Sequence, residues 1–192
     1  MLIVSDLHLG KSERIARRGG ALLPPYDTIE TLTRLSSDLG ATRPRTVVCL
    51  GDSFDDLGAA EALAPEHRDT LARLQAGRRW IWIEGNHDPG PVDLGGEHLA
   101  ELTVNSLTFR HIAVGGADPG EISGHYHPKA KVRHISRPCF MRDAGRLILP
   151  AYGSYTGGLD WMTPVLRTLF QPKAVAYLTG TRVLAVPVPV AA

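Results

Sequence analysis

The chain has few cysteines and no long apolar run, and both absences narrow the class of protein. Its 192 residues include only Cys49 and Cys139, which lie far apart, so free thiols are expected rather than a disulfide framework. No stretch is long and apolar enough to cross a bilayer, and the chain does not begin like a secretory signal. We therefore expect a cytoplasmic protein without a membrane partner, in which Cys49 is a core side chain.

The chain also lacks an excess of charge of either sign. The net charge of +1 argues neither for nor against nucleic acid as a partner, but residues 11–20 and residues 129–146 are locally basic. Each basic segment directly follows one of the motifs described below. If the motifs converge, the basic side chains should surround one cleft and attract a polyanion; the alternative is an ordinary solvated surface.

The first half of the sequence alternates strand-like and helix-like patterns. Apolar runs at 2–4, 46–50 and 80–84 read as strands, and the unbroken run at 46–50 indicates a parallel sheet covered on both faces. One helix should start at Asp27 as N-cap, with Glu30 as its capping-box partner, and stop at Gly40; a second should run from Pro65 to Gly77. These two helix boundaries follow from the local capping signals.

The second half is predominantly of β type. Asn105-Ser106 and Gly180-Thr181 are typical of hairpin turns, and a short helix is expected at 164–170. The β-like runs are 102–104, 107–110, 121–123, 146–149, 174–178 and 182–186. With 43% hydrophobic residues and no linker, residues 1–192 are expected to form a single α/β domain.

Metal-binding residue types stand directly after four of the strand-like runs. Ligands of open α/β sheets bind at the carboxyl ends of strands. Each motif alone could be a polar turn, but four at strand ends indicate a site for two metal ions. The motifs are Asp6-Leu7-His8, Gly51-Asp52, Gly85-Asn86-His87-Asp88 and Gly124-His125-Tyr126-His127.

Such a site suits the hydrolysis of phosphate esters. Two divalent ions about 3.5 to 4 Å apart can hold a shared hydroxide as the nucleophile and clamp the phosphate. Asp6 and Asp52 are the only ionised side chains expected as ligands, so the metal core would stay positive and attract an anionic phosphate. Ligands of histidine and oxygen without thiolate favour Mn²⁺, with iron or zinc as alternatives.

In their order these motifs resemble the calcineurin-like metallophosphoesterase superfamily, with a lone histidine at His111 completing the set over residues 6–127. The resemblance implies a β-sandwich flanked by helices. It also implies that His87 is the general acid, that Asp55 orients His87, and that Asp88 braces its own loop. The implied metal ligands are Asp6, His8 and His127 for the first ion, Asn86, His111 and His125 for the second, and Asp52 as the bridge.

A narrower resemblance links the chain to the bacterial DNA ligase-associated metallophosphoesterases. It implies a DNA endonuclease of DNA repair, with a DNA ligase and a helicase as partners. Members of this group usually have a further N-terminal β segment, so the edge of the first strand could be bare and pair with a second copy as a homodimer. The segments that carry the resemblance are 18–20, 22–28, 137–140 and 150–158.

The same segments supply candidates for substrate binding. Tyrosines could stack on bases, or they could pack the β half of the domain instead. The candidates are Arg17, Arg18, Tyr26, Lys129 and Tyr155. His67, His98 and His134 are expected to be surface residues.

Two other functions stay open. The enzyme could be a small-molecule phosphomonoesterase or a cyclic-nucleotide phosphodiesterase of the same fold. Alternatively, the chain could be a non-catalytic subunit of a ligase or helicase repair complex.

Overall fold

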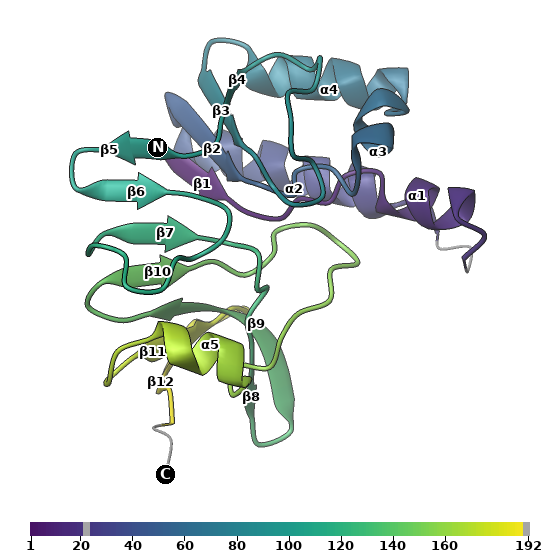
Figure 1. Ribbon diagram of the computed structural model, residues 1–192. Coiled ribbons are helices and arrows are strands. Elements are labelled where there is room, and N and C mark those ends of the chain that lie inside the picture. Colours follow the sequence, from purple (N-terminus) through teal and green to yellow (C-terminus); the bar gives the residue numbers. More distant parts are fainter. Residues whose placement is uncertain (21–23, 190–192) are drawn as a thin grey trace.

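Two β-sheets face each other with helices on their outer sides, as Figure 1 shows for the computed structural model, which describes residues 1–20 and 24–189. The first sheet is parallel, in the order β1-β2-β3-β4, and lies beneath α2 and α4. Its elements are β1 (Leu2–Val4), β2 (Thr46–Leu50), β3 (Arg79–Ile83), β4 (Glu97–Leu99), α2 (Asp27–Thr42) and α4 (Pro65–Gln75). The predicted α/β sandwich flanked by helices is confirmed.

The second sheet is mixed and has the order β12-β11-β9-β10-β7-β6-β5, with β8 paired to β9. Its outer face is covered by α5 (Pro164–Leu169), whose Leu166 shares a buried cluster with Met141 and Ala176. Its strands are β5 (Leu102–Val104), β6 (Leu107–Phe109), β7 (Glu121–Ser123), β8 (Lys129–Val132), β9 (Ile135–Arg142), β10 (Arg146–Ile148), β11 (Val175–Leu178) and β12 (Leu184–Pro187).

Alternation along β2 explains why its sequence is apolar without a break. Val47 and Cys49 point into the cluster under the helices, whereas Val48 and Leu50 point into the cluster between the two sheets. Successive side chains of a strand lie on opposite faces, so a strand covered on both sides needs apolar residues throughout. The prediction of a doubly covered parallel strand is therefore confirmed.

The predicted boundaries of α2 were wrong at both ends. Asp27 is not the N-cap; Tyr26 holds that place, and the Asp27 carboxylate accepts hydrogen bonds from the Lys11 N–H at 3.0 Å and the Ser12 hydroxyl at 2.5 Å. The predicted capping box with Glu30 is thus replaced by a tertiary contact. The helix also continues through Gly40 to Thr42, because the left-handed C-cap is Arg43, with φ 44°.

Several elements were missed in the sequence. No helix was predicted where α1 (Lys11–Arg17) lies. The same holds for α3 (Leu57–Glu61), which the Asp56 carboxylate caps by accepting the Ala59 N–H at 2.7 Å. The hairpin of β8 and β9 was missed because Lys129, Lys131 and Pro138 are residue types that are depleted in strands. His98, expected at the surface, is half-buried in β4, and its ring stacks on that of Trp82 with the centroids 6.4 Å apart.

Other expectations hold. Both predicted hairpin turns join antiparallel pairs, β5 with β6 and β11 with β12. Cys49 and Cys139 are free and fully buried. Among the helices of the described residues, none has the length and apolar character that crossing a bilayer requires.

Candidate metal centre

The loops that follow β1, β2, β3 and β7 meet at one edge of the sandwich. Backbone hydrogen bonds fasten the first two loops together: the N–H of Asp6 donates to the Gly51 carbonyl at 3.2 Å, and the N–H of His8 donates to the Asp52 carbonyl at 2.9 Å. The β7 loop joins them because the N–H of His125 donates to the Asp6 carboxylate at 3.0 Å. The convergence expected of the motifs is observed.

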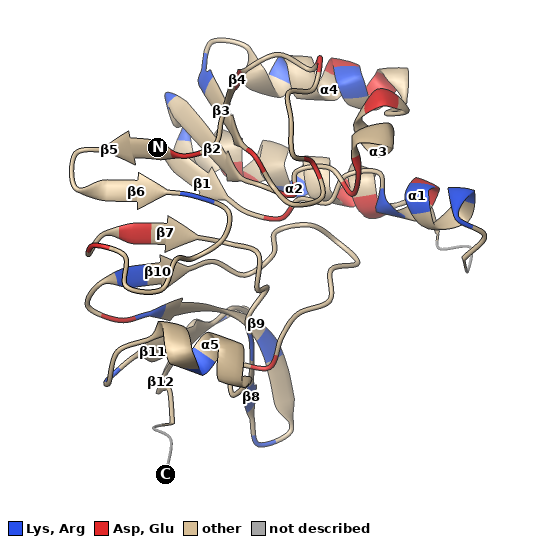
Figure 2. Ribbon diagram, in the orientation of Figure 1, with Lys and Arg blue, Asp and Glu red and all other residues tan. Residues whose placement is uncertain are grey.

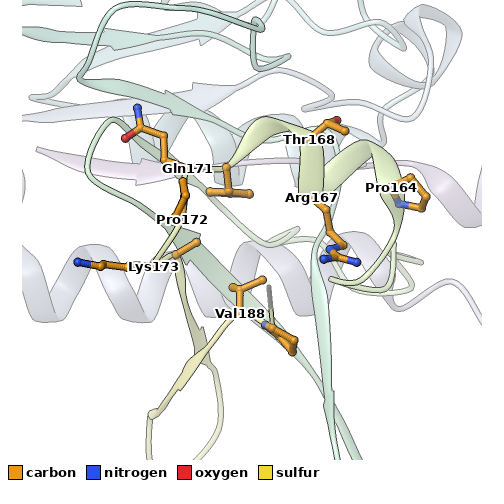
Figure 3. A pocket seen from close by; sticks show the side chains of 10 residues that line it. Pro164, Arg167, Thr168, Gln171, Pro172, Lys173 and Val188 are labelled. Atoms are coloured by element: carbon orange, nitrogen blue, oxygen red, sulfur yellow. The ribbon is translucent and has the colours of Figure 1, made fainter. Parts of the chain in front are cut away.

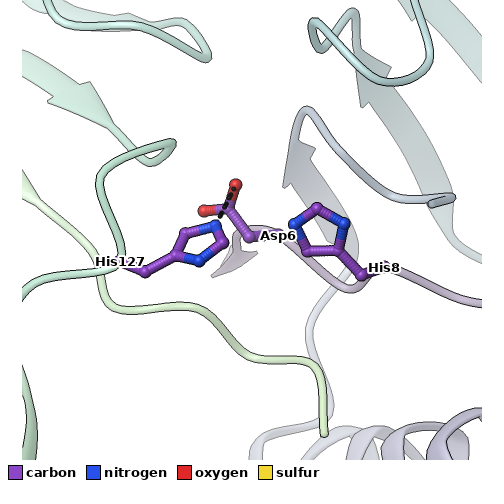
Figure 4. Close-up of side chains that lie close together, drawn as sticks. All are labelled: Asp6, His8 and His127. Atoms are coloured by element: carbon purple, nitrogen blue, oxygen red, sulfur yellow. Dashed lines mark ion pairs between the residues drawn. The ribbon is translucent and has the colours of Figure 1, made fainter. Parts of the chain in front are cut away.

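One group of donors consists of Asp6, His8 and His127, shown in Figure 4, whose ligand atoms lie within 4.8 Å of one another. Nε2 of His127 is 3.1 Å from Asp6 Oδ1. Nε2 of His8 is buried and has no hydrogen-bond partner among the described residues, and the buried Nε2 of His127 meets the Asp6 carboxylate without the geometry of a hydrogen bond. Buried ring nitrogens need a partner, and a divalent cation suits them, so the residues present fit a metal ion.

A second group consists of Asp52, His111 and His125. Asn86 joins it, with Oδ1 3.0 Å from His111 Nε2, and His125 Nδ1 is 3.2 Å from the same nitrogen. Asp52 Oδ2 lies 3.4 Å from His111 Nε2 and 3.9 Å from His8 Nε2, so this carboxylate stands between the two groups. The structure thus brings together all seven residues predicted as ligands.

Most of these seven residues have an uncommon backbone conformation. The φ angles of Asp6, His8, Asp52, His125 and His127 are 55°, 46°, 46°, 68° and 45°. A non-glycine residue in this left-handed region costs about 1–3 kcal/mol, so it persists only where its surroundings impose it. Here the hydrogen bonds between the loops impose the conformation, which is typical of a functional site.

Hydrogen bonds to the histidine rings favour the free nitrogens that a metal needs. His111 Nδ1 lies 2.8 Å from the Leu50 carbonyl oxygen, which can only accept, so Nδ1 carries the hydrogen and Nε2 faces Asp52. Burial acts to raise the pKa of Asp52, but the contacts of its carboxylate with His111, with the backbone N–H of His87 and with His8 hold that pKa well below the ordinary value. Asp52 is therefore an anion at neutral pH.

Asp55, the residue predicted to orient His87, contacts its ring through the backbone. The ring Nδ1 of His87 lies 2.9 Å from the backbone carbonyl oxygen of Asp55. The backbone N–H of His87 donates to Asp52 Oδ1 at 2.9 Å. The Asp55 carboxylate instead lies 2.9 Å from His8 Nδ1 and 3.7 Å from the Lys11 ammonium. Asp55 therefore contacts the His87 ring through its main chain and not through its carboxylate.

Asp88 braces the loop of the Asp52 carboxylate. Its two oxygens accept the N–H groups of Asp52, Ser53, Phe54 and Gly85 at 2.8 to 3.1 Å. Burial raises the pKa of Asp88 to about 6, although the N–H groups of Phe54 and Ser53 oppose the rise. Asp88 thus has a structural role, because it ties the loop after β3 to the loop after β2.

The basic charge of α1 is largely offset by ion pairs. Arg17 and Arg18 share the Asp56 carboxylate at 2.9 and 3.4 Å, and Arg14 pairs with Asp55. The sequence predicts that this basic segment attracts a polyanion if the motifs converge. In the structure, two carboxylates following β2 pair with these cations and hold α1 beside the metal ligands.

The β8–β9 hairpin keeps its charge. Lys131, Arg133 and Arg142 are exposed, and none has an ion pair within residues 1–20 and 24–189. Figure 2 shows basic residues along this hairpin, whereas acidic residues gather where the strands of the first sheet end. The hairpin begins two residues after His127, so it extends directly from the metal ligands.

The remaining substrate candidates lie at the surface or beside the ligands. Tyr26 and Tyr155 are 62% and 39% exposed, so neither packs the β half in full. The Lys129 ammonium is 3.4 Å from the Thr156 carbonyl oxygen. Leu22 and Leu23 of the quoted segment 22–28 lie outside the described residues.

A cavity of about 400 Å³ lies away from this centre, between α5 and the chain around Pro172 and Val188 (Figure 3). Its lining includes Phe170, Ala174 and Pro189, and it contains none of the seven predicted ligands. Its walls are mostly apolar, and although Arg167 and Lys173 line it, no histidine or carboxylate that could hold a metal ion does.

Comparison with known proteins identifies a family and a solved structure that this chain resembles. The family model for calcineurin-like phosphoesterases matches residues 1–176. Among solved structures, the Pseudomonas putida nuclease MPE superposes with a TM-score of 0.74 at 28% sequence identity, covering 96% of this chain and 86% of that one. A search of curated proteins found no match. With the aspartate and histidine groups described above, the chain is a metal-dependent phosphoesterase and belongs to the calcineurin-like phosphoesterase family.

Proposed function

We propose that the enzyme is a two-metal DNA phosphodiesterase, most simply an endonuclease of DNA repair, that works with Mn²⁺. The observation that carries the proposal is the position of Asp52 between the two donor groups, 3.4 Å from His111 and 3.9 Å from His8. A carboxylate shared by two sets of imidazole ligands suits a pair of cations. The donor set of oxygen and nitrogen without thiolate favours Mn²⁺, with iron or zinc as alternatives.

The bound ions would supply charge neutralisation and an activated water nucleophile. Asp6, His8 and His127 would hold one ion, and Asn86, His111 and His125 the other, with Asp52 shared. Since Nδ1 of His87 faces a carbonyl oxygen, Nε2 is the nitrogen that can give its proton to the leaving oxygen.

DNA is the favoured substrate because basic side chains extend from the metal ligands along the β8–β9 hairpin. Lys131 lies in β8 and Arg133 in the turn that follows, where they can neutralise successive phosphates. The solved neighbour named above is itself a nuclease. A DNA ligase and a helicase would be the partners, as the family resemblance implies.

The test is cleavage of a labelled single-stranded oligonucleotide with Mn²⁺, Fe²⁺ or Zn²⁺ and after chelation. We expect cleavage with Mn²⁺ and none with Asp52→Asn. Intact DNA with every metal would contradict the proposal. Faster turnover of p-nitrophenyl phosphate than of bis-p-nitrophenyl phosphate would favour a phosphomonoesterase instead.

A charge-reversal variant separates DNA binding from chemistry. We expect the double variant Lys131→Glu with Arg133→Glu to bind DNA more weakly. The slope of log K against log salt concentration should become less steep by about 2, one for each lost phosphate contact. Hydrolysis of bis-p-nitrophenyl phosphate should not change. The control is Arg73→Glu on α4, an exposed position whose guanidinium donates to the Thr70 hydroxyl of the same helix. Unchanged DNA binding by the double variant would exclude the hairpin as the DNA surface.

A further inference from the structure

The segment from Tyr152 to Leu159, here called the strap, joins two loops that carry metal ligands. At one end, the N–H of Tyr152 donates to the Ser5 carbonyl at 2.8 Å, and the N–H of Gly153 donates to the Asp6 carbonyl at 3.0 Å. The strap therefore pairs with the main chain of a predicted ligand of the first ion.

The other end of the strap holds the loop of His127. The N–H of Leu159 donates to the Tyr126 carbonyl at 3.2 Å, and the Leu159 carbonyl accepts the N–H of Lys129 at 2.8 Å. Within the strap, the Thr156 hydroxyl donates to the Gly153 carbonyl at 2.9 Å and keeps the turn closed. Asp6 and His127, far apart in sequence, are thus connected through one short segment.

A third set of contacts fastens the strap to α2. The Tyr152 hydroxyl donates to Asp38 Oδ2 at 2.6 Å, and the Arg34 guanidinium lies 4.6 Å above the Tyr152 ring while donating to the Tyr152 carbonyl. The N–H of Ser154 donates to the Thr31 hydroxyl at 3.0 Å. Burial raises the pKa of Tyr152, and Asp38 adds to the rise, so the hydroxyl stays a donor.

Two glycines let the strap approach the ligand loops closely. A Cβ on Gly153 would overlap the Leu7 carbonyl oxygen, and a Cβ on Gly158 would overlap the His127 carbonyl oxygen. Both obstacles are backbone atoms, so a side chain would have to displace the loop itself. Gly157, between them, faces open space, and a Cβ there would meet no atom within 4 Å.

We propose that the strap sets the separation of Asp6 and His127 and thereby controls the affinity of the first metal site without touching the metal. Gly153, Gly158 and Tyr152 are positioning residues, and Arg34 acts through Tyr152. Groups that hold metal ligands in place typically change metal affinity by about 10- to 100-fold when they are removed. The inference rests on the proposed two-metal site.

The decisive experiment is calorimetric titration of the metal-free protein with Mn²⁺. We expect two sites in the wild type, and in Gly153→Ala and in Gly158→Ala one site weakened by about 10- to 100-fold with the other retained. Gly157→Ala, the matched control on the same strap, should titrate like the wild type. Equal affinities in all four proteins would overturn the inference.

A remote variant covers the case in which the glycine variants do not fold. Arg34→Ala lies on the exposed side of α2, and it should weaken the same single site, whereas Arg73→Ala on α4 should not. Urea unfolding of the metal-free proteins shows whether a change of affinity is only a loss of stability. Weakening of both sites alike by Arg34→Ala would contradict a role confined to the first site. A wild type that binds no metal would overturn the proposed function as well.

Discussion

The backbone carbonyl oxygen of Asp55 lies 2.9 Å from Nδ1 of His87, while the carboxylate of the same residue faces His8. One residue thus serves two histidines through different groups. A substitution of the Asp55 side chain changes the contacts to His8, Lys11 and Arg14. It leaves the contact to His87 in place, because every residue has a backbone carbonyl.

Asp55→Asn should therefore weaken metal binding and leave the acid in place. We expect the Mn²⁺ concentration for half-maximal activity to rise about tenfold, because the carboxylate orients His8. The relative rates on substrates with good and poor leaving groups should match the wild type. An unchanged Mn²⁺ requirement would show that the Asp55 carboxylate has no part in orienting His8.

His87→Asn should separate protonation of the leaving group from the other catalytic steps. We expect DNA cleavage to fall by about 10²- to 10⁴-fold, the usual contribution of a general acid. The rate of bis-p-nitrophenyl phosphate hydrolysis should fall far less, because p-nitrophenolate departs without a proton. Equal losses on both substrates in single-turnover assays would argue against the role of His87.

Asp88→Asn should destabilise the loop of Asp52. The carboxylate accepts four N–H groups, two on each oxygen, and asparagine keeps an acceptor oxygen for only two of them. Hydrogen bonds to a charged group are worth about 1.5–3 kcal/mol each, so the loss of two predicts a decrease of at least about 3 kcal/mol in the free energy of unfolding. Urea unfolding measures the loss. Asp93→Asn, at an exposed position, is the control, and equal stability of the two variants would refute the bracing role.

Tyr152→Phe should change how the free energy of unfolding depends on pH in alkaline solution. The pKa of Tyr152 is raised by burial and by Asp38, so the folded state keeps this proton more tightly than the unfolded state does. The resulting stabilisation is complete below the ordinary tyrosine pKa of about 10 and is lost as the pH rises above it. Unfolding free energy should fall more steeply above about pH 10 in the wild type than in the variant; parallel curves would contradict this assignment.

Both thiols should be inert in the folded protein. Cys49 and Cys139 are fully buried, and burial raises the pKa of Cys139 to about 12. Ellman's reagent should therefore find no fast-reacting thiol in native protein and two after denaturation. One rapid equivalent in the native state would mean that a strand opens locally.

The strand runs and the metal motifs could be read from the sequence because their signals are local. The run 46–50 is apolar since both faces of β2 are covered, and Asp6 and Asp52 follow strands whose ends share one edge. Boundaries were less predictable. Aspartate is a residue type typical of an N-cap, yet the Asp27 carboxylate accepts a hydrogen bond from the Ser12 hydroxyl instead. No local pattern predicts this contact.

The charge of α1 shows the same limit at the site. Its cations were visible in the sequence, but the ion pairs of Arg14 with Asp55 and of Arg17 with Asp56 depend on where the loop after β2 places those carboxylates. The net charge that a substrate meets is therefore a property of the folded loops.

The sequence by itself determined the chemistry, because the identities of Asp6, Asp52, His87 and the other donors are written in short motifs at strand ends. Only the tertiary structure decided which group orients which. That the Asp55 main chain faces His87, and that Gly153 pairs with Asp6, depends on contacts between segments distant in the chain. Such contacts arise from packing, which residue types alone do not specify.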